Sequence, residues 1–180
     1  KEDLKNGRLK KKLKKFENKN LISYGCNIID NDILKMFSKN TWNIHAGLSP
    51  WYRGSATHFW PTYLLEPEYT GMTVHDLTDK IDGGNIIHQG IVNLNPKDGI
   101  HENSCRCLFD FFEEILKLLD ESVFKKKVKG IVQKSTGRIW TQKMWHPKLL
   151  EVIYGQFNDR INEFCFKGKH LRPPKIETIF

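Results

Sequence analysis

The sequence is poor in cysteine and contains no long apolar run. Its four cysteines form no CxxC pair, and two of them are separated by a single residue, which does not suit a disulfide scaffold. No stretch approaches the roughly 20 consecutive apolar residues of a membrane-spanning helix. The opening KEDLKNGRLK lacks the apolar segment of a secretory signal. With a mean hydropathy of −0.53, the sequence predicts a soluble globular protein of the cytoplasm.

Histidine and cysteine are also not arranged as metal ligands. The residues considered as ligands are His45, His58, His75, His88 and Cys26. They show none of the short, regular spacings that are typical of a zinc site. We therefore expect no metal.

Charge is unevenly distributed along the 180 residues. Segments 1–20, 21–120 and 121–180 carry net charges of +6, −6 and +8, within a total of +8. Lysine runs such as those at 10–15 and 125–129 are more typical of solvated helix faces or turns than of a nucleic-acid interface. We therefore expect no nucleic-acid partner. A diphosphate-bearing small molecule would be attracted by the same basic ends.

Apolar periodicity predicts alternating strands and helices, as in an α/β protein. Short apolar runs predict the strands Leu21–Ile29, Trp42–His45, Gly71–Leu77, Ile86–Val92 and Gly137–Trp140. Apolar residues at helical spacing predict the helices Leu4–Phe16, Ile33–Phe37, Glu102–Val123 and Pro147–Phe164. The turn Asp82-Gly83-Gly84-Asn85 indicates that the strands on either side of it form a hairpin.

Three polar side chains occupy positions where burial is expected. Asn43 and His45 lie two residues apart in one strand, so both side chains point to the same side. Asp82 precedes two glycines and reaches the same site if the hairpin packs beside that strand. A histidine near a core and an aspartate before glycine are more often structural than functional. On spacing alone, both interpretations stay open.

Three longer motifs surround these residues, at 43–54 (NIHAGLSPWYRG), 70–75 (TGMTVH) and 81–89 (IDGGNIIHQ). In content, order and spacing they resemble the formyltransferase family that uses 10-formyltetrahydrofolate. The resemblance covers roughly residues 20–124. It implies an α/β, Rossmann-like formyltransferase fold, with a half-Rossmann catalytic domain in which an Asn, a His and an Asp surround the formyl group.

Carried over to this sequence, the resemblance implies that Asn43, His45 and Asp82 are catalytic. An amine that attacks a formyl carbon creates an oxyanion, which Asn43 and a protonated His45 would stabilise. Asp82 would raise the pKa of His45, orient its ring and relay the proton that the amine loses. Two neighbours stay open: His75 as a supporting or a cross-strand packing residue, and Arg53 as a loop anchor or a phosphate contact.

The resemblance also implies a folate site made largely by backbone groups. The family uses the strand segment before the Asn and the loop before the Asp. These segments correspond to Cys26, Asn27, Ile28 and Ile29, and to Thr78, Asp79, Lys80 and Ile81. A flat pterin between an apolar strand edge and a polar loop can be bound by main-chain donors and acceptors. We therefore expect 10-formyltetrahydrofolate as the co-substrate.

The stretch at 48–61 resembles enzymes that formylate amino sugars on nucleotide carriers, such as those of lipopolysaccharide O-antigen biosynthesis. Methionyl-tRNA formyltransferases share its Tyr-Arg-Gly sequence, but they need a C-terminal tRNA-binding barrel, and only about 55 residues follow the helix 102–123. Glycinamide ribonucleotide enzymes differ in this stretch. Trp140, Trp145 and Tyr154 either stack a nucleobase or cover the core.

We expect a formyltransferase catalytic domain at 1–124 and a small C-terminal extension at 125–180. Family members place about two further βα units before the strand that ends at Ile29, so the resemblance implies an N-terminally incomplete fold. Lys1 in place of an initiator methionine agrees with that expectation. The alternative function is therefore an inactive homologue that acts as a binding or scaffold module. We expect no membrane partner, and the sequence leaves a homodimer open.

Overall fold

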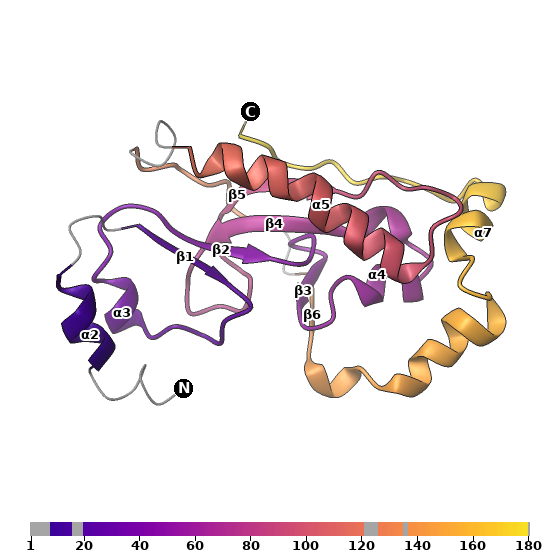
Figure 1. The fold of residues 1–180 in the computed structure, drawn as a ribbon, viewed down its shortest axis with the longest axis horizontal. Coiled ribbons are helices and arrows are strands. Elements are labelled where there is room, and N and C mark those ends of the chain that lie inside the picture. Colours follow the sequence, from indigo (N-terminus) through magenta and orange to yellow (C-terminus); the bar gives the residue numbers. More distant parts are fainter. Residues whose placement is uncertain (1–7, 16–19, 121–125, 135–136, 180) are drawn as a thin grey trace.

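A computed structural model describes residues 8–15, 20–120, 126–134 and 137–179. It is built around one four-stranded sheet (Figure 1). The strands are β1 (Leu21–Tyr24), β2 (Thr41–His45), β4 (Gly71–Asp76) and β5 (Ile86–Ile91), in the spatial order β1-β2-β4-β5. β1 and β2 run parallel, whereas β2 with β4 and β4 with β5 run antiparallel. The predicted hairpin is thus confirmed.

The long helix α5 (Ile100–Leu118) packs on this sheet and confirms the α/β class (Figure 1). It begins two residues before the predicted Glu102, and the predicted end at Val123 lies outside the described residues. Its positions 107, 111 and 118 are one helical face, which is buried against the sheet. The buried residues of this sheet core are Trp42, Met72, Val74, Ile87, Val92, Cys107, Phe111 and Leu118.

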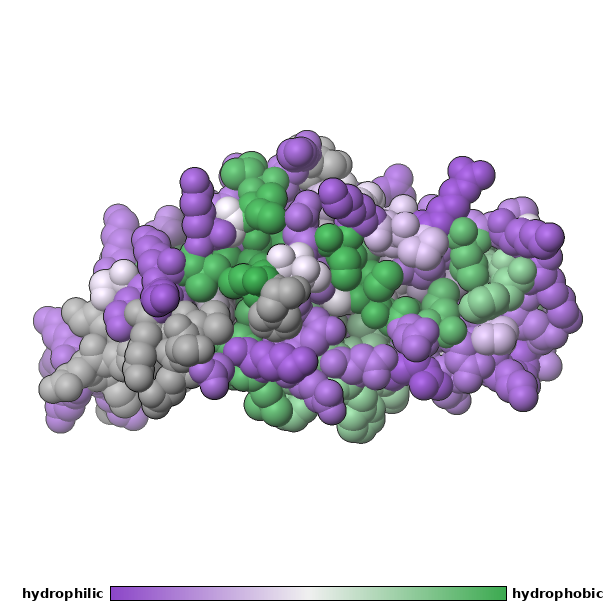
Figure 2. Space-filling view, turned by 90° about the horizontal axis from the view of Figure 1, so that it is seen from above, coloured by the Kyte–Doolittle hydropathy of each residue, from purple (hydrophilic) through white to green (hydrophobic). Residues whose placement is uncertain are grey.

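The opposite face of α5 is apolar as well. Phe109 is 78% exposed, and Phe112 and Leu116 are also exposed. Figure 2 shows apolar side chains on the side of the molecule where α5 runs in Figure 1. The apolar stripe of α5 is therefore wider than the surface that the sheet covers. Within the described ranges, no helix combines the length and hydropathy needed to cross a membrane.

A second core forms where the chain after α5 returns to the segment between β2 and β4. Strand β3 (Tyr52–Gly54) pairs in parallel with β6 (Arg138–Trp140), next to α4 (Phe59–Tyr63) and η1 (Pro67–Tyr69). Trp140 stacks on Trp60 with 4.2 Å between ring centroids. The buried residues of this aromatic core are Tyr52, Phe59, Trp60, Ile100, Trp140, Ile153, Ile161 and Cys165.

The predicted helix Pro147–Phe164 is wrong, because this stretch is broken into three short helices. They are η3 (Pro147–Leu149), the π-helix η4 (Val152–Gln156) and α7 (Ile161–Gly168), preceded by η2 (Gln142–Met144). Asn158 and Asp159 adopt left-handed backbone conformations between the last two. The Asp159 carboxylate accepts a hydrogen bond of 2.9 Å from the Ile100 N–H. This contact with the first turn of α5 explains why the helix stops there.

The N-terminal part of the chain follows the predicted βα order, but the ends of its strand and helices differ from the predicted ones. β1 ends at Tyr24 because Gly25 adopts a left-handed conformation with φ of 62°. α3 (Asn31–Leu34) starts and ends earlier than the predicted Ile33–Phe37. α2 (Arg8–Leu13) lies within the predicted helix Leu4–Phe16, whose remaining ends lie outside the described residues. β3 and α4 were not predicted from the sequence.

The last described residues form an extended tail along the edge of β5. The Gln89 N–H donates to the Glu177 carbonyl at 2.8 Å, and the Glu177 N–H donates to the Gln89 side chain at 3.2 Å. Further back along β5, Ile86 and Ile131 form an antiparallel bridge. β5 is therefore flanked by β4 on one side and by later parts of the chain on the other.

Candidate active site

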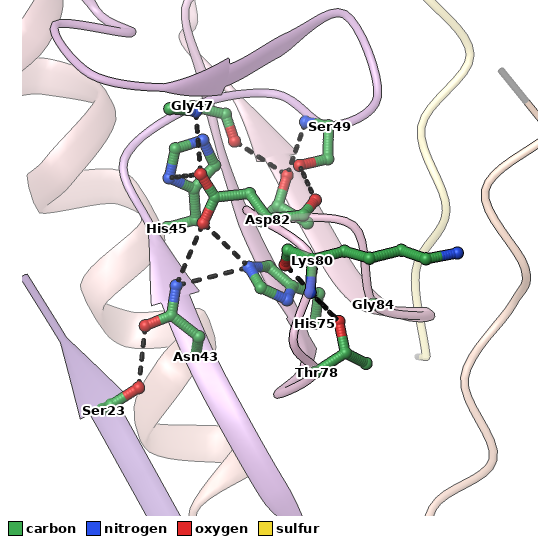
Figure 3. Close-up of polar contacts among 12 residues, drawn as sticks. Ser23, Asn43, His45, Gly47, Ser49, His75, Thr78, Lys80, Asp82 and Gly84 are labelled. Carbon is green, nitrogen blue, oxygen red and sulfur yellow. Dashed lines mark hydrogen bonds and ion pairs between the residues drawn. The ribbon is translucent and has the colours of Figure 1, made fainter. Parts of the chain in front are cut away.

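Asn43, His45, His75 and Asp82 converge at the carboxyl end of β2 (Figure 3). The strand pairing places Asn43 opposite His75 on β4. The turn after β4 brings Asp82 back over both residues and over His45. The packing on which the predicted site depended is thus present, and the three predicted catalytic residues lie together.

The Asp82 carboxylate is the centre of the site. Its Oδ2 accepts a hydrogen bond of 2.8 Å from the Gly54 N–H on β3, and lies 3.6 Å from His45 Nδ1. Its Oδ1 lies 3.4 Å from His75 Nε2 and 3.5 Å from Asn43 Nδ2. Burial raises the pKa of this carboxyl, whose side chain is 14% exposed, but the contacts with His75, His45 and Gly54 outweigh burial and lower the pKa below its ordinary value. Asp82 is therefore ionised at neutral pH.

His45 is buried and held in one orientation. Its Nε2 contacts the Tyr52 carbonyl at 2.9 Å, and because a carbonyl only accepts, Nε2 carries the proton. Burial lowers the pKa of His45, whereas the charge of Asp82 raises it, and the net shift is downward. The predicted influence of Asp82 is present, but burial outweighs it and the resting ring is neutral. The neutral ring presents the lone pair of Nδ1 toward Asp82.

Asn43 owes its orientation to a residue that the sequence did not point to. The Ser23 hydroxyl on β1 donates to Asn43 Oδ1 at 2.8 Å, in the register that pairs Ser23 with Asn43. Because Oδ1 is thus occupied, the Nδ2 group faces Asp82 and His75 (Figure 3). The amide presents its donor, not its acceptor, to the centre of the site.

His75 lies in the site and is also the cross-strand neighbour of Asn43, so both interpretations that its sequence position left open agree with the structure. Its Nδ1 donates to the Asp76 carbonyl at 2.9 Å, so Nε2 bears the lone pair in the neutral ring. Nε2 lies 3.3 Å from Asn43 Nδ2 and accepts from it. In the charged ring, the same atom would donate to Asp82.

A cleft of about 630 Å³ opens beside these residues. Asn43, His45, His75 and Asp82 are among its lining residues. Of the eight residues predicted to bind folate, seven line it, namely Cys26, Asn27, Ile28, Ile29, Thr78, Lys80 and Ile81. Asp79 is exposed and is not among the lining residues. One concave site therefore joins the two predicted segments.

The loop after β2 is tied to the sheet by buried polar groups. The Thr73 hydroxyl donates to the Gly47 carbonyl at 2.8 Å and accepts from the Ser49 N–H at 3.0 Å. The Gln89 amide donates to the Ser49 carbonyl at 2.5 Å. A side chain at Gly47 would collide with the His45 ring and the Tyr52 carbonyl. The loop is thereby fixed close to His45.

The structure does not bring the other proposed contacts to the cleft. Arg53 is not among its lining residues, and Arg53 Nη1 lies 3.0 Å from the position of a Cβ on Gly83, which favours a loop anchor. Trp140 is buried in the aromatic core, and Trp145 packs edge-on against Phe59. Tyr154 lines no part of the cleft. Trp140 therefore covers the core, whereas stacking of a nucleobase on Trp145 or Tyr154 stays a prediction.

Metal ligands do not gather in the part of the chain that the structure describes. No group of three or more His, Cys, Asp or Glu side chains lies close enough there to hold an ion. The polar groups of the site contact one another instead. The expectation of metal-free chemistry stays a prediction.

Comparisons with known proteins agree with this geometry. The formyl transferase family matches residues 2–110. Methionyl-tRNA formyltransferase from Buchnera aphidicola is 35% identical over 103 residues, which are 57% of this chain and 32% of that protein. The chain thus spans about a third of the length of this curated relative.

Solved structures share the fold over a larger part of the chain. Formyltransferase PseJ from Anoxybacillus kamchatkensis, in complex with UDP-4,6-dideoxy-4-formamido-L-AltNAc and tetrahydrofolate, has a TM-score of 0.62 and 26% identity over 81% of this chain and 75% of that chain. A 4-N formyltransferase from Francisella tularensis has a TM-score of 0.63 and 23% identity over 77% of this chain and 54% of that chain. The sequence match, the Rossmann-like fold and the site agree, and the chain belongs to the formyl transferase family.

Proposed function

We propose that this chain transfers a formyl group from 10-formyltetrahydrofolate to the amino group of a nucleotide-linked amino sugar. The observation that carries the proposal is the convergence of Asn43, His45 and Asp82 at the wall of the cleft. That cleft is also lined by the two segments that the family resemblance assigns to folate. A binding module or scaffold would give no reason for an ionised carboxylate and a neutral histidine to meet there.

The folate would lie between segment 26–29 and the loop 78–81. Ile28 and Ile81 line the cleft and are largely exposed, so a flat apolar ring system would cover them. Main-chain donors and acceptors of the same segments would contact the polar edge of a pterin. The tetrahydrofolate in the complex of PseJ supports this class of ligand.

Asn43 would stabilise the oxyanion. Amine attack forms a carbon–nitrogen bond and turns the formyl oxygen into an oxyanion. Asn43 Nδ2 is the donor that Ser23 holds toward the centre of the site. A donor that is oriented in advance stabilises the developing charge without reorganisation.

His45 and Asp82 would handle the proton. The neutral His45 ring can accept the amine proton at Nδ1, directly or through water, and the Asp82 carboxylate 3.6 Å away stabilises the resulting imidazolium. When the intermediate collapses, the bond from carbon to the folate nitrogen breaks. That nitrogen then takes up a proton from the same pair. His45 therefore starts as a base and ends as an acid.

Two observations favour an amino sugar as the acceptor. The likeness to PseJ extends over 81% of this chain, beyond the residues 2–110 that match the family. In the described residues after α5, the chain forms β6, short helices and a tail packed on the sheet and the aromatic core, not a separate barrel. Methionyl-tRNA is the second candidate, because the Buchnera protein with 35% identity is named for that substrate.

Calorimetric titration with a non-transferable analogue of 10-formyltetrahydrofolate tests the co-substrate. Binding with a Kd in the micromolar range, about −8 kcal/mol, is expected. Asp110→Asn is the control, because Asp110 is an exposed carboxylate of α5 that is not among the lining residues of the cleft, and it should bind as tightly as the wild type. A folded chain that does not bind the analogue would overturn the proposal.

Formyl transfer assays then separate the acceptors. Transfer to UDP- or dTDP-linked 4-amino sugars but not to methionyl-tRNA is expected. The reverse result would establish the second candidate. Binding of the folate analogue without transfer to either acceptor would favour the inactive homologue.

A further inference from the structure

The side chain of Gln133 contacts the backbone on both sides of the Asp82–Gly83 turn. Its Nε2 donates to the Asp82 carbonyl at 2.9 Å and to the Gly84 carbonyl at 2.7 Å. Carbonyl groups only accept, so only the NH₂ end of the amide can make both bonds. The orientation of the side chain is therefore fixed by its two partners.

Strand pairing after α5 places Gln133 there. Ile86 and Ile131 exchange backbone hydrogen bonds of 2.8 and 2.7 Å in an antiparallel bridge. In an antiparallel register, residue 133 then lies opposite residue 84. Gly130 allows the close approach, because a Cβ there would lie 2.7 Å from the Asn85 Cβ. Gln133 lies outside the residues 2–110 that match the family.

Two other hydrogen bonds to the backbone of the turn that Gln133 contacts are longer than those from Gln133. Asp82 adopts a left-handed conformation with φ of 43°, which is unfavourable for a residue with a side chain. The Gly83 N–H donates to the Lys80 carbonyl at 3.4 Å, and the Ser49 hydroxyl donates to the Asp82 carbonyl at 3.4 Å. The two bonds from Gln133 are shorter than both. They hold the carbonyls on either side of Gly83.

The position of this turn sets the position of the Asp82 carboxylate. One end of the residue is held by Gln133 through its carbonyl, and the other end accepts from the Gly54 N–H at 2.8 Å. A displacement of the backbone would change the 3.6 Å separation from His45 and the contact with Asn43. Proton transfer depends on such separations to within a fraction of an ångström.

We infer that Gln133 is a positioning residue for formyl transfer, which fixes the Asp82 turn from outside the family-matched segment. The inference rests on the proposed function for its effect on the reaction. The restraint itself is a property of the fold and has its own measurement. The two can therefore fail separately.

Gln133→Met is the first variant, because methionine keeps the volume and lacks both donors. Gln133 Oε1 is buried without a hydrogen-bond partner in the described residues, so its removal offsets part of the cost of the two lost bonds. The overall stability should therefore change little. Gln142→Met is the matched control, since Gln142 is an exposed glutamine of the same segment.

Hydrogen exchange of the Gly54 amide reports on the carboxylate directly, because this N–H donates to Asp82. In Gln133→Met, the Gly54 amide should exchange about tenfold faster, while amides of β4 and β5 keep their rates. The kcat of formyl transfer should fall about tenfold, and the KM for the amine acceptor should stay within twofold. Gln142→Met should change none of these quantities. A general loss of stability would instead accelerate all amides.

Gln133→Glu tests whether the turn is held by the two donated hydrogen bonds or by any polar side chain at this position. It keeps length and polarity, but its carboxylate cannot donate and repels both carbonyl groups. It should accelerate Gly54 exchange at least as much as Gln133→Met. Wild-type behaviour of Gln133→Glu would overturn the inference, because the two donated bonds would then not hold the turn.

The remaining outcomes distinguish a failure of the inference about Gln133 from a failure of the proposed function. If the wild type transfers formyl and Gln133→Met has unchanged kcat and Gly54 exchange, the inference is wrong and the proposed function stands. If the wild type neither binds folate nor transfers formyl, the proposed function is wrong. Gln133 then has no formyl transfer to influence. Faster Gly54 exchange in Gln133→Met would then support only the restraint on the turn.

Discussion

The sheet core and the aromatic core are built from different parts of the chain, and the candidate site lies where they meet. The sheet core takes its buried residues from β2, β4, β5 with the adjoining Val92, and α5, all between residues 42 and 118. The aromatic core combines residues 52–60 and Ile100, the first residue of α5, with residues 140–165. His45 belongs to a strand of the first, whereas the Gly54 N–H that binds Asp82 belongs to the second. Site geometry therefore depends on a core whose residues lie between positions 52 and 165 of the sequence.

The largest expected effect is on catalysis and not on the stability of either core. Asp82→Asn should lower kcat about 1,000-fold, which corresponds to about 4 kcal/mol, because the charge that stabilises the His45 imidazolium is lost. Asparagine tolerates the left-handed backbone and can still accept from the Gly54 N–H, so the urea midpoint should fall only slightly. Steady-state kinetics and urea unfolding test this. Asp110→Asn, at an exposed carboxylate of α5 outside the cleft lining, should stay within twofold of the wild type, and a similar loss there would contradict a specific role of Asp82.

Acid should weaken the junction of the two cores through His58. Burial lowers the pKa of His58 to about 4, and the ring contacts the Gly71 carbonyl at 3.0 Å. The unfolded chain binds a proton near pH 6.5 and the folded chain only near pH 4, so stability is present above pH 6.5 and is lost as pH falls to 4. The loss amounts to roughly 3 kcal/mol.

Urea unfolding between pH 7 and pH 4 measures this loss. His58→Gln can still donate to the Gly71 carbonyl but does not titrate, so its pH dependence should be smaller by that amount. Identical slopes for the variant and the wild type would show that the acid sensitivity arises elsewhere.

Matched truncations in the two cores should cost similar stability but affect catalysis differently. Trp140→Leu and Phe111→Leu should each lower the free energy of unfolding by about 2 kcal/mol. Only Trp140→Leu should also lower kcat, about tenfold, because β6 pairs with β3 and thereby places Gly54. Unfolding and kinetics of both variants test the difference. An equal loss of kcat in both would remove the distinction between the cores.

The smallest expected effect concerns the link from α7 back to α5. Asp159→Ala should cost about 1 kcal/mol, because it removes the carboxylate that accepts the Ile100 N–H at the start of α5. Asp159→Asn keeps a side-chain oxygen and should cost less. The kcat should stay unchanged in both, since Asp159 contacts no residue of the site. Thermal unfolding is the measurement. Equal stability of Asp159→Ala and the wild type would show that the hydrogen bond from the Ile100 N–H to Asp159 does not stabilise the fold.

Local patterns predicted the parts of the fold that depend on neighbouring residues. Alternation in β2 placed Asn43 and His45 on one side, and helical spacing identified α5. Ser23 and Gln133 could not be predicted in the same way, because their hydrogen bonds span 20 and about 50 residues of sequence. The net downward shift of the His45 pKa could not be predicted either, because the sequence indicates its charged partner but not the extent of its burial.

The second half of the chain shows the same limit. Apolar spacing alone favours one helix from 147 to 164, yet Asp159 turns away to contact α5. The predicted strand Gly137–Trp140 contains β6, whereas the three-residue β3 was not predicted and is defined only by its pairing with β6. A pattern of such length carries no period that distinguishes it from a loop.

The tail along β5 makes the two edges of the sheet different. Glu177 and Ile131 occupy hydrogen-bonding groups on one edge, whereas β1 has β2 as its single partner in the described part of the chain. An edge whose backbone groups are free can accept a further strand, and an edge already occupied cannot. The sheet can therefore grow in one direction only, and any strand added there would lie beside Tyr24 and the segment that borders the cleft.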